Sequence, residues 1–167
     1  MAMHNEWNTL PDSARLWIYG ANRILNADEQ VAISEALGTF CGEWSAHGEK
    51  LRCGFTILHN SLIVLAVDEQ QALASGCSID SSVAIIRTLD ADYQLDLFNR
   101  LRVYIMDGDH WKICSTSEFK NGLADGTYHS DTPVFDTTIQ WFGVLKSSSV
   151  KPVQETWLSR FIPASAG

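Results

Sequence analysis

The segment with the clearest chemical content is Ser75-Gly76-Cys77-Ser78-Ile79-Asp80. Its glycine turn delivers Cys77 to the N-terminus of a predicted helix, where amide dipoles favour a thiolate over a thiol. A thiolate in this setting is a nucleophile. We therefore take Cys77 and Asp80 as candidate catalytic residues and Ser78 as a candidate ligand contact.

The same segment also has a purely structural interpretation. The carboxylate of Asp80 disfavours a second negative charge nearby, which opposes a thiolate at Cys77. In this interpretation the cysteine packs inward, while Ser78 and Asp80 cap the helix. A sulfur exposed beside a hollow favours the chemical interpretation, and a sulfur buried in aliphatic packing removes it.

Four more charged or titratable residues are candidate ligand contacts. Asp68 and Glu69 close an apolar strand, where carboxylates serve as acid, base or metal ligand, or simply begin a solvated loop. Arg23 follows the first predicted strand and is either an anion clamp or an ion-pair partner. His47 is predicted in the last turn of a helix, where the C-terminal dipole stabilises an imidazolium, and this position favours a structural role.

Common phosphate and metal motifs do not occur in the sequence. Five residues separate Gly42 from Gly48 and Glu49 precedes Lys50, so this segment departs from P-loop spacing. It also falls at the end of a predicted helix, where carbonyl oxygens repel phosphate. The chain has no G-x-G-x-x-G, G-x-S-x-G or H-E-x-x-H motif, and its four cysteines form no C-x-x-C pair. We expect free thiols, no metal site, no cofactor and no P-loop ATPase activity.

Charge and hydropathy exclude two classes of partner. The 167 residues include 20 acidic and 12 basic side chains, for a net charge of −8, and no short window gathers the basic residues that nucleic acid or anionic lipid requires. The longest aliphatic run, residues 62–67, is far shorter than a membrane helix, which needs ~20 residues. Residues 1–12 lack the apolar segment of a secretory signal. We expect an acidic cytoplasmic protein that binds neither nucleic acid nor membrane.

Local patterns place the candidate residues on strands and helices. The predicted elements are a strand at 13–19, a helix from the capping box at Asn26 and Glu29 to Gly48, strands at 51–58 and 61–67, a helix that begins at Ser78 or Asp80, strands at 102–106 and 110–114, and a helix from Ser115 to Gly122 or Gly126. The uniformly apolar run at 61–67 indicates a central strand, and 51–58 lies nearer an edge. Residues 133–145 fit either a helix that begins at Pro133 or a strand.

The element order predicts the fold class. Strand, helix, hairpin, helix and strand between residues 14 and 107 match the order of a ferredoxin-like split β-α-β-β-α-β unit. We therefore expect one α+β domain over residues 1–167, with that unit at about 14–107. An added strand and C-terminal helices would occupy about 108–167, and residues 157–162 should dock on the body of the domain.

Several distinctive segments together resemble a known family. They are Leu16-Trp17-Ile18-Tyr19, Asn22-Arg23, Trp44 with His47-Gly48, Val67-Asp68-Glu69, Ser75 to Val83, Thr132 with Val134-Phe135, and Trp157 with Arg160-Phe161. In these segments the chain is similar to small uncharacterised bacterial proteins that often carry the label "ABC transporter ATPase". The likeness runs from about Leu10 to Ile162, and it implies a compact cytoplasmic protein without an established activity. The missing nucleotide motifs indicate that the label is a transferred name.

These observations leave two functional hypotheses. In the first, the chain is a small-molecule-binding domain or an enzyme, with its site at the Gly76-Cys77-Ser78-Ile79-Asp80 turn and with Asp68, Glu69, Arg23 or His47 nearby. In the second, it is a non-catalytic interaction module. An open sheet face or an exposed strand edge would then meet a protein partner or form a homodimer.

Overall fold

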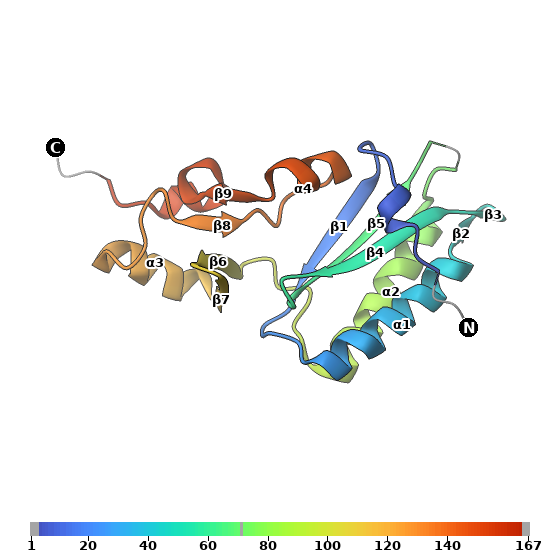
Figure 1. Ribbon diagram of the computed structural model, residues 1–167, viewed down its shortest axis with the longest axis horizontal. Helices are drawn as coiled ribbons and strands as arrows, with labels where there is room; N and C mark the ends of the chain where they lie inside the picture. Colours follow the sequence, from blue (N-terminus) through green and yellow to red (C-terminus); the bar gives the residue numbers. More distant parts are fainter. Residues whose placement is uncertain (1–3, 71, 165–167) are drawn as a thin grey trace.

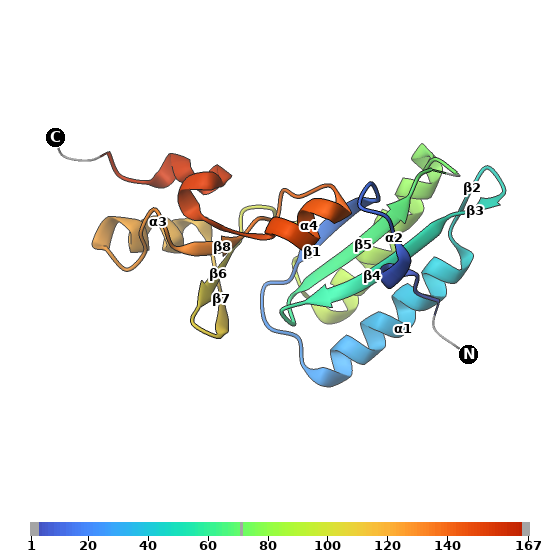
Figure 2. The same cartoon turned by 45° about the horizontal axis from the view of Figure 1, so that its top comes forward.

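The computed structural model describes residues 4–70 and 72–164, and its first layer is a three-stranded antiparallel sheet (Figure 1). The strands are β1 (Arg15–Gly20), β4 (Arg52–Leu58) and β5 (Leu62–Asp68), in the order β1-β5-β4. Two helices, α1 (Ala27–Glu43) and α2 (Gly76–Tyr93), lie side by side against one face of this sheet (Figures 1 and 2). The sheet is therefore the floor on which both helices pack.

The central strand β5 explains why this sheet forms. Every residue of β5 is buried, and its alternate side chains enter two different cores. Ile63, Leu65 and Val67 pack toward the helices, whereas Leu62 and its alternating neighbours pack on the opposite face. The apolar run thus predicted a strand covered on both faces, and this prediction is confirmed.

A second antiparallel sheet follows in the sequence. Its strands are β6 (Val103–Asp107), β7 (His110–Cys114), β8 (Pro133–Phe135) and β9 (Val150–Pro152), in the order β7-β6-β8-β9. The helix α3 (Thr116–Asp125) and two short 3-10 helices, η2 (Val153–Glu155) and η3 (Trp157–Phe161), complete this part. They share a separate core, in which Phe119 is fully buried.

The two sheets meet over the face of the first sheet that the helices leave free. Leu62, Val64 and Ala66 of β5 contact a group that includes Tyr104 of β6 and Phe142 of the short helix α4 (Phe142–Ser148). The 3-10 helix η1 (Trp7–Thr9) also packs here, because the rings of Trp7 and Phe142 meet edge to face at 4.8 Å. This shared core joins the N-terminal and C-terminal halves.

The α+β class is confirmed, whereas the ferredoxin-like arrangement is not. The order β1-β5-β4 with two helices on one face is the order that three of the four expected strands would take. The fourth, β6, would pair with β1 in that arrangement. Instead β6 pairs with β7 along its length and with β8 at Ile105 and Val134, and so it belongs to the second sheet.

Two helix boundaries differ from their predictions. The helix α1 ends at Glu43 rather than at Gly48, so His47 does not lie in its last turn. The residues after it form a small hairpin of β2 (Ser45–Ala46) and β3 (Glu49–Lys50), with His47 at a φ of 52° in the turn. The N-cap of α2 is Ser75, which precedes both of the predicted caps, Ser78 and Asp80.

Residues 133–145, for which the sequence allowed either a helix or a strand, contain a short strand followed by the start of a helix. Residues 133–135 form β8, and the helix begins only at Phe142. Between them Asp136 turns the chain, since its carboxylate accepts hydrogen bonds from the backbone N–H and the hydroxyl of Thr138 at 3.0 and 2.5 Å. In the described part of the chain, no helix combines the length and apolar character needed to cross a membrane.

Candidate functional site

Cys77 lies in the first turn of α2, and its side chain is exposed. The N-cap Ser75 organises this turn, because its hydroxyl accepts a hydrogen bond from the backbone N–H of Ser78 at 3.2 Å. The carbonyl of Ser75 accepts a second from Ile79 at 2.9 Å. Among the described residues, the backbone N–H groups of Gly76 and Cys77 donate no hydrogen bond, as is usual for the first residues of a helix. The sulfur therefore stands in the setting that the sequence predicted.

Cys77 opens onto a hollow of about 540 Å³. The residues that line it are mostly small and polar: Ser45, His47, Ser75, Gly76, Cys77, Ser78 and Ser81. The hydrogen bond from Trp44 Nε1 to the carbonyl of Ser78, at 2.8 Å, joins the start of the β2–β3 hairpin to α2. This contact brings His47 to the same hollow as Cys77 and Ser78, although the two segments are far apart in the sequence.

The other predicted site residues do not line this hollow. Asp80 is exposed and lies outside the lining. Asp68 is buried and pairs with Arg52 at 3.1 Å. Glu69 accepts a hydrogen bond from the backbone N–H of Ala74 at 3.2 Å. Asp68 also accepts a hydrogen bond from the backbone N–H of Gln70 at 3.0 Å, so both carboxylates at the end of β5 have partners within the fold.

Arg23 is an ion-pair partner, the structural alternative of its two predicted roles. Its guanidinium forms two hydrogen bonds of 2.8 Å with Glu29 and one of 2.9 Å with the carbonyl of Tyr93. Glu29 also completes the capping box of α1 with Asn26. The hydrogen bond from Arg23 and the bond to the Asn26 backbone lower the pKa of Glu29 to about 2.

The remaining cysteines behave as buried apolar residues. Cys41, Cys53 and Cys114 are buried free thiols. A hydrogen bond with Cys53, together with burial, raises the pKa of the Cys41 thiol. Within the residues that the structure describes, no three His, Cys, Asp or Glu side chains gather as metal ligands would.

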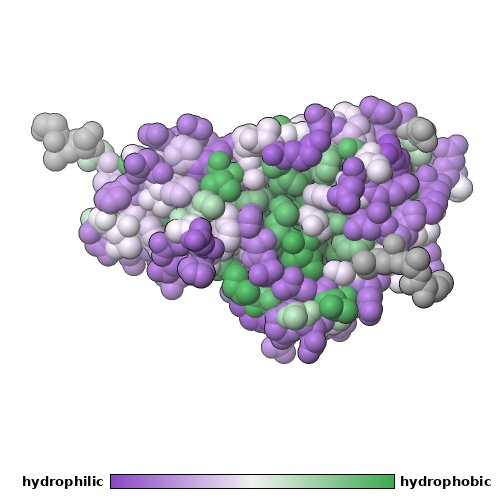
Figure 3. Space-filling model, in the orientation of Figure 1, coloured by the Kyte–Doolittle hydropathy of each residue, from purple (hydrophilic) through white to green (hydrophobic). Residues whose placement is uncertain are grey.

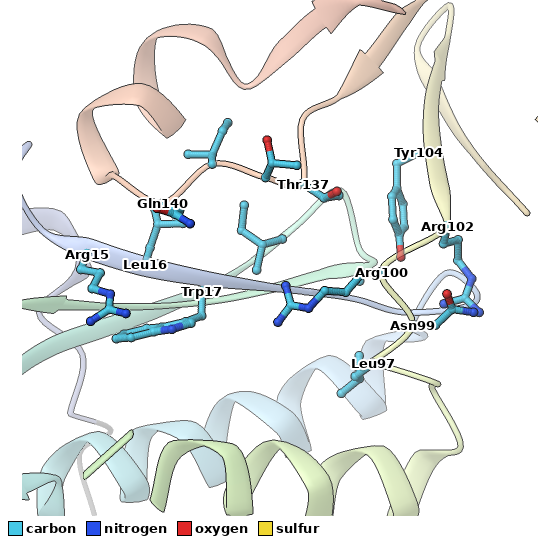
Figure 4. Close-up of a pocket in the computed structure, with 14 residues that line it drawn as sticks. Arg15, Leu16, Trp17, Leu97, Asn99, Arg100, Arg102, Tyr104, Thr137 and Gln140 are labelled. Carbon is cyan, nitrogen blue, oxygen red and sulfur yellow. The ribbon is translucent and has the colours of Figure 1, made fainter. Parts of the chain in front are cut away.

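The structure also contains a cavity that the sequence analysis did not predict. It has a volume of about 410 Å³ and lies beside β1, between the two sheets (Figure 4). Its lining comes from three segments, which are β1, residues 97–104 and residues 137–140. Apolar side chains gather at the middle of the face shown in Figure 3, between the two halves, with hydrophilic surface around them. The lining of the cavity is mixed, because apolar residues of β1 such as Trp17 and Ile18 stand beside arginines, Asn99, Tyr104 and the polar residues of 137–140.

Three arginines give the cavity its charge. Arg102 pairs with Asp96 at 2.6 Å, and Arg15 lies 3.7 Å from Glu69. Arg100 forms no ion pair within residues 4–70 and 72–164. Arg100 is exposed, and Figure 4 shows its side chain among the residues that line the cavity. Because the described lining includes no carboxylate, this guanidinium is available to an anion.

Tyr104 forms the end wall of the cavity. Its hydroxyl donates a hydrogen bond of 2.8 Å to the carbonyl of Ala21, just beyond β1. Burial raises the pKa of this hydroxyl to about 12, against the opposing charge of Arg102. Tyr104 therefore remains protonated and acts as a fixed hydrogen-bond donor between the two sheets.

The sequence carries one signal for this cavity. Arg100 and Arg102 flank Leu101 immediately before β6, a spacing of basic residues that the chain repeats at Lys50 and Arg52. Only the tertiary structure brings this pair to the side of β1. Comparison with family models, with curated proteins and with solved structures finds no match for this chain.

Proposed function

We propose that the protein is a ligand-binding domain that takes an organic anion in the cavity beside β1. Arg100 carries this proposal, because it is a permanent positive charge in a cavity whose described lining has no acidic side chain. In a protein with a net charge of −8, a pocket of this sign is selective for anions. A carboxylate would accept two parallel hydrogen bonds from the guanidinium.

The remaining lining supports a ligand with an apolar part. Trp17 and Leu97 offer apolar surface beside Arg100, and Tyr104 closes the end of the cavity. The volume of about 410 Å³ lies within the range of ~300–1,000 Å³ that is usual for small-molecule sites. A small carboxylic acid therefore fits both the size and the charge of the cavity.

Thermal unfolding with added carboxylates tests this proposal. Succinate and 2-oxoglutarate at about 10 mM serve as probes, and a ligand that binds only the folded state raises the unfolding midpoint. We expect an increase that is lost in Arg100→Gln and kept in Lys120→Gln, a matched variant at an exposed lysine of α3. No increase with either acid, or an equal increase in both variants, would refute the proposal.

A second candidate function uses the hollow at α2. The specific observation is that an exposed thiol, Cys77, lines the same hollow as an imidazole, His47. In this candidate the sulfur of Cys77 forms a bond to an electrophilic carbon, while its proton passes to His47 and the leaving group departs with the electron pair of the broken bond. The free N–H groups of Gly76 and Cys77 would stabilise negative charge there.

Alkylation by iodoacetamide tests this second candidate. Because Cys41, Cys53 and Cys114 are buried, the reagent should label Cys77 first, and peptide mass spectrometry identifies the site. If His47 acts as the base, His47→Gln slows labelling at pH 7 at least tenfold. A control, His129→Gln, replaces an exposed histidine outside the hollow and should leave the rate unchanged. Equal rates in the wild type and in both variants would remove His47 from the chemistry.

A further inference from the structure

The outer edge of β1 is a row of hydrogen-bonding groups that the sheet leaves open. Successive residues of a strand direct their backbone groups to opposite edges. Leu16 directs its N–H outward, because that group donates to the carbonyl of Gln140 at 2.9 Å. Ile18 and Gly20, at spacings of two, therefore face the same way. Among residues 4–70 and 72–164, β5 is the only strand of this sheet that pairs with β1, so these groups face the cavity instead of another strand.

A neighbouring segment begins to pair with this edge and then leaves it. Besides the bond from Leu16, the N–H of Phe142 donates to the carbonyl of Ala14 at 2.9 Å, and this forms one antiparallel bridge between Arg15 and Trp141. Residues 137–140 then line the cavity. The edge already accepts an extended chain at its first residue, and the cavity begins where that chain turns away.

The open groups belong to residues that line the cavity. Ile18 is only 7% exposed, yet its N–H and carbonyl find no hydrogen-bond partner in the described part of the chain. Buried backbone groups are almost always paired with protein, water or ligand. The stretch from Leu16 to Gly20 spans about 13 Å at ~3.3 Å per residue, which accommodates roughly four or five residues of an extended peptide.

We propose that the ligand of this cavity is an extended acidic peptide segment of a partner protein, which adds to the first sheet as a strand beside β1. This inference rests on the anion site proposed above, and it specifies the class of ligand. The main chain of the peptide pairs with the carbonyl of Leu16, both groups of Ile18 and the N–H of Gly20, as in other cases of strand addition. A carboxylate of the peptide pairs with Arg100.

The two faces of β1 would select the side chains of the peptide. Trp17 lies on the helix side of the strand, and Ile18 lies on the side of the second sheet. Alternate side chains of an added strand point to these two sides. Apolar residues that alternate with glutamates would therefore place apolar groups toward one side and carboxylates toward Arg100. A small organic anion would satisfy Arg100 but would leave the backbone groups of Ile18 without partners.

The test uses three pentapeptides with blocked ends. The first, the parent, is acetyl-Val-Glu-Val-Glu-Val-amide. The second has N-methyl groups on the backbone nitrogens of both glutamates, and the third has them on the backbone nitrogens of the N-terminal and C-terminal valines. Strand addition uses the N–H groups of alternate residues only, so one methylated peptide should bind at least tenfold more weakly than the parent, and the other within about threefold. Titration calorimetry measures all three affinities.

Amide hydrogen exchange of the intact protein gives a second readout that needs no variant. The parent peptide should slow exchange at Ile18 at least tenfold, because its N–H gains a carbonyl partner. Exchange at Trp17, whose backbone already pairs with Leu65 of β5, should not change. Succinate, which has no strand backbone, should leave exchange at Ile18 as it was.

The outcomes of these measurements separate this inference from the proposed function. Suppose that succinate binds through Arg100. If the parent peptide then does not bind, or if both methylated peptides bind as tightly as the parent, the anion site stands and strand addition is wrong. If neither succinate nor any peptide binds, both proposals fall. Protection of Ile18 that rises with protein concentration in the absence of peptide would overturn the assignment to a partner and indicate a second copy of this chain.

Discussion

Tyr104→Phe removes a single oxygen from the junction between the two sheets. Tyr104 belongs to β6 of the second sheet, yet its hydroxyl donates a hydrogen bond of 2.8 Å to Ala21, just past β1 of the first sheet. Both residues are almost fully buried, with exposed fractions of 2% and 0%. Phenylalanine keeps the ring and its packing, so the substitution isolates the contribution of the hydroxyl.

The expected cost follows from what remains after the substitution. The carbonyl of Ala21 stays buried without its donor, and an unsatisfied buried group costs about 1–3 kcal/mol. For a chain of this length, each kcal/mol lowers the midpoint of thermal unfolding by ~2–4 °C. We therefore expect Tyr104→Phe to lower the midpoint by ~2–12 °C.

Circular dichroism during thermal unfolding measures this change, and Tyr19→Phe provides a matched control. Tyr19 is also buried, at 3% exposed, but its hydroxyl forms no hydrogen bond among the described residues. Its substitution should lower the midpoint by less than half as much. An unchanged midpoint in Tyr104→Phe, or equal losses in the two variants, would show that the bond to Ala21 does not stabilise the junction.

Three further predictions concern stability. Gly20→Ala places a methyl group in steric conflict with the hydroxyl oxygen of Tyr104. We expect a loss of ~1–3 kcal/mol in urea unfolding, and a stability equal to that of the wild type would show that the ring moves freely. Burial raises the pKa of the Tyr104 hydroxyl to about 12 in the folded protein. In the unfolded chain the same hydroxyl has a pKa of about 10, so it loses its proton there at lower pH. The stability that this hydroxyl contributes is therefore fully present below pH 10 and is lost as the pH rises toward 12. Between pH 9 and pH 11, the free energy of unfolding in urea should fall less in Tyr104→Phe than in the wild type. Trp44→Phe removes the hydrogen bond to Ser78 and should cost ~2–3 kcal/mol by the same assay. The exposed Trp141 is the control, because Trp141→Phe should cost less than about 0.5 kcal/mol.

Much of the secondary structure was predictable because its signals are local. The capping boxes at Asn26 and Ser115 mark the starts of α1 and α3, since each serves backbone groups within the first turn of its helix. The Asp-Gly step before Asp109 gives the β6–β7 turn. Gly108 adopts a φ of 62° in this turn. These interactions require no distant partner.

Helix ends and the α2 cap were predicted less well because several residues compete there. The pattern of α1 continues to Gly48 in the sequence, but Trp44 is drawn into the core and donates to Ser78 of α2. This contact ends the helix early and allows the chain to form the β2–β3 hairpin. The position of His47 is therefore set by a contact with a distant part of the chain.

The two candidate sites also differ in whether local sequence or distant contacts determine them. The sequence alone identified Cys77 and its helix N-terminus, because a glycine, a cap and a cysteine are adjacent in the chain. The tertiary structure alone decided that β6 leaves the first sheet, that the edge of β1 at Ile18 stays open, and that Arg100 lies beside it. Strand pairing depends on which distant segments bury the most apolar surface together, and Tyr104 packs against Gly20 within the core that the two sheets share. A pattern within one strand specifies which face is buried, but the partner at each edge is chosen by the rest of the molecule.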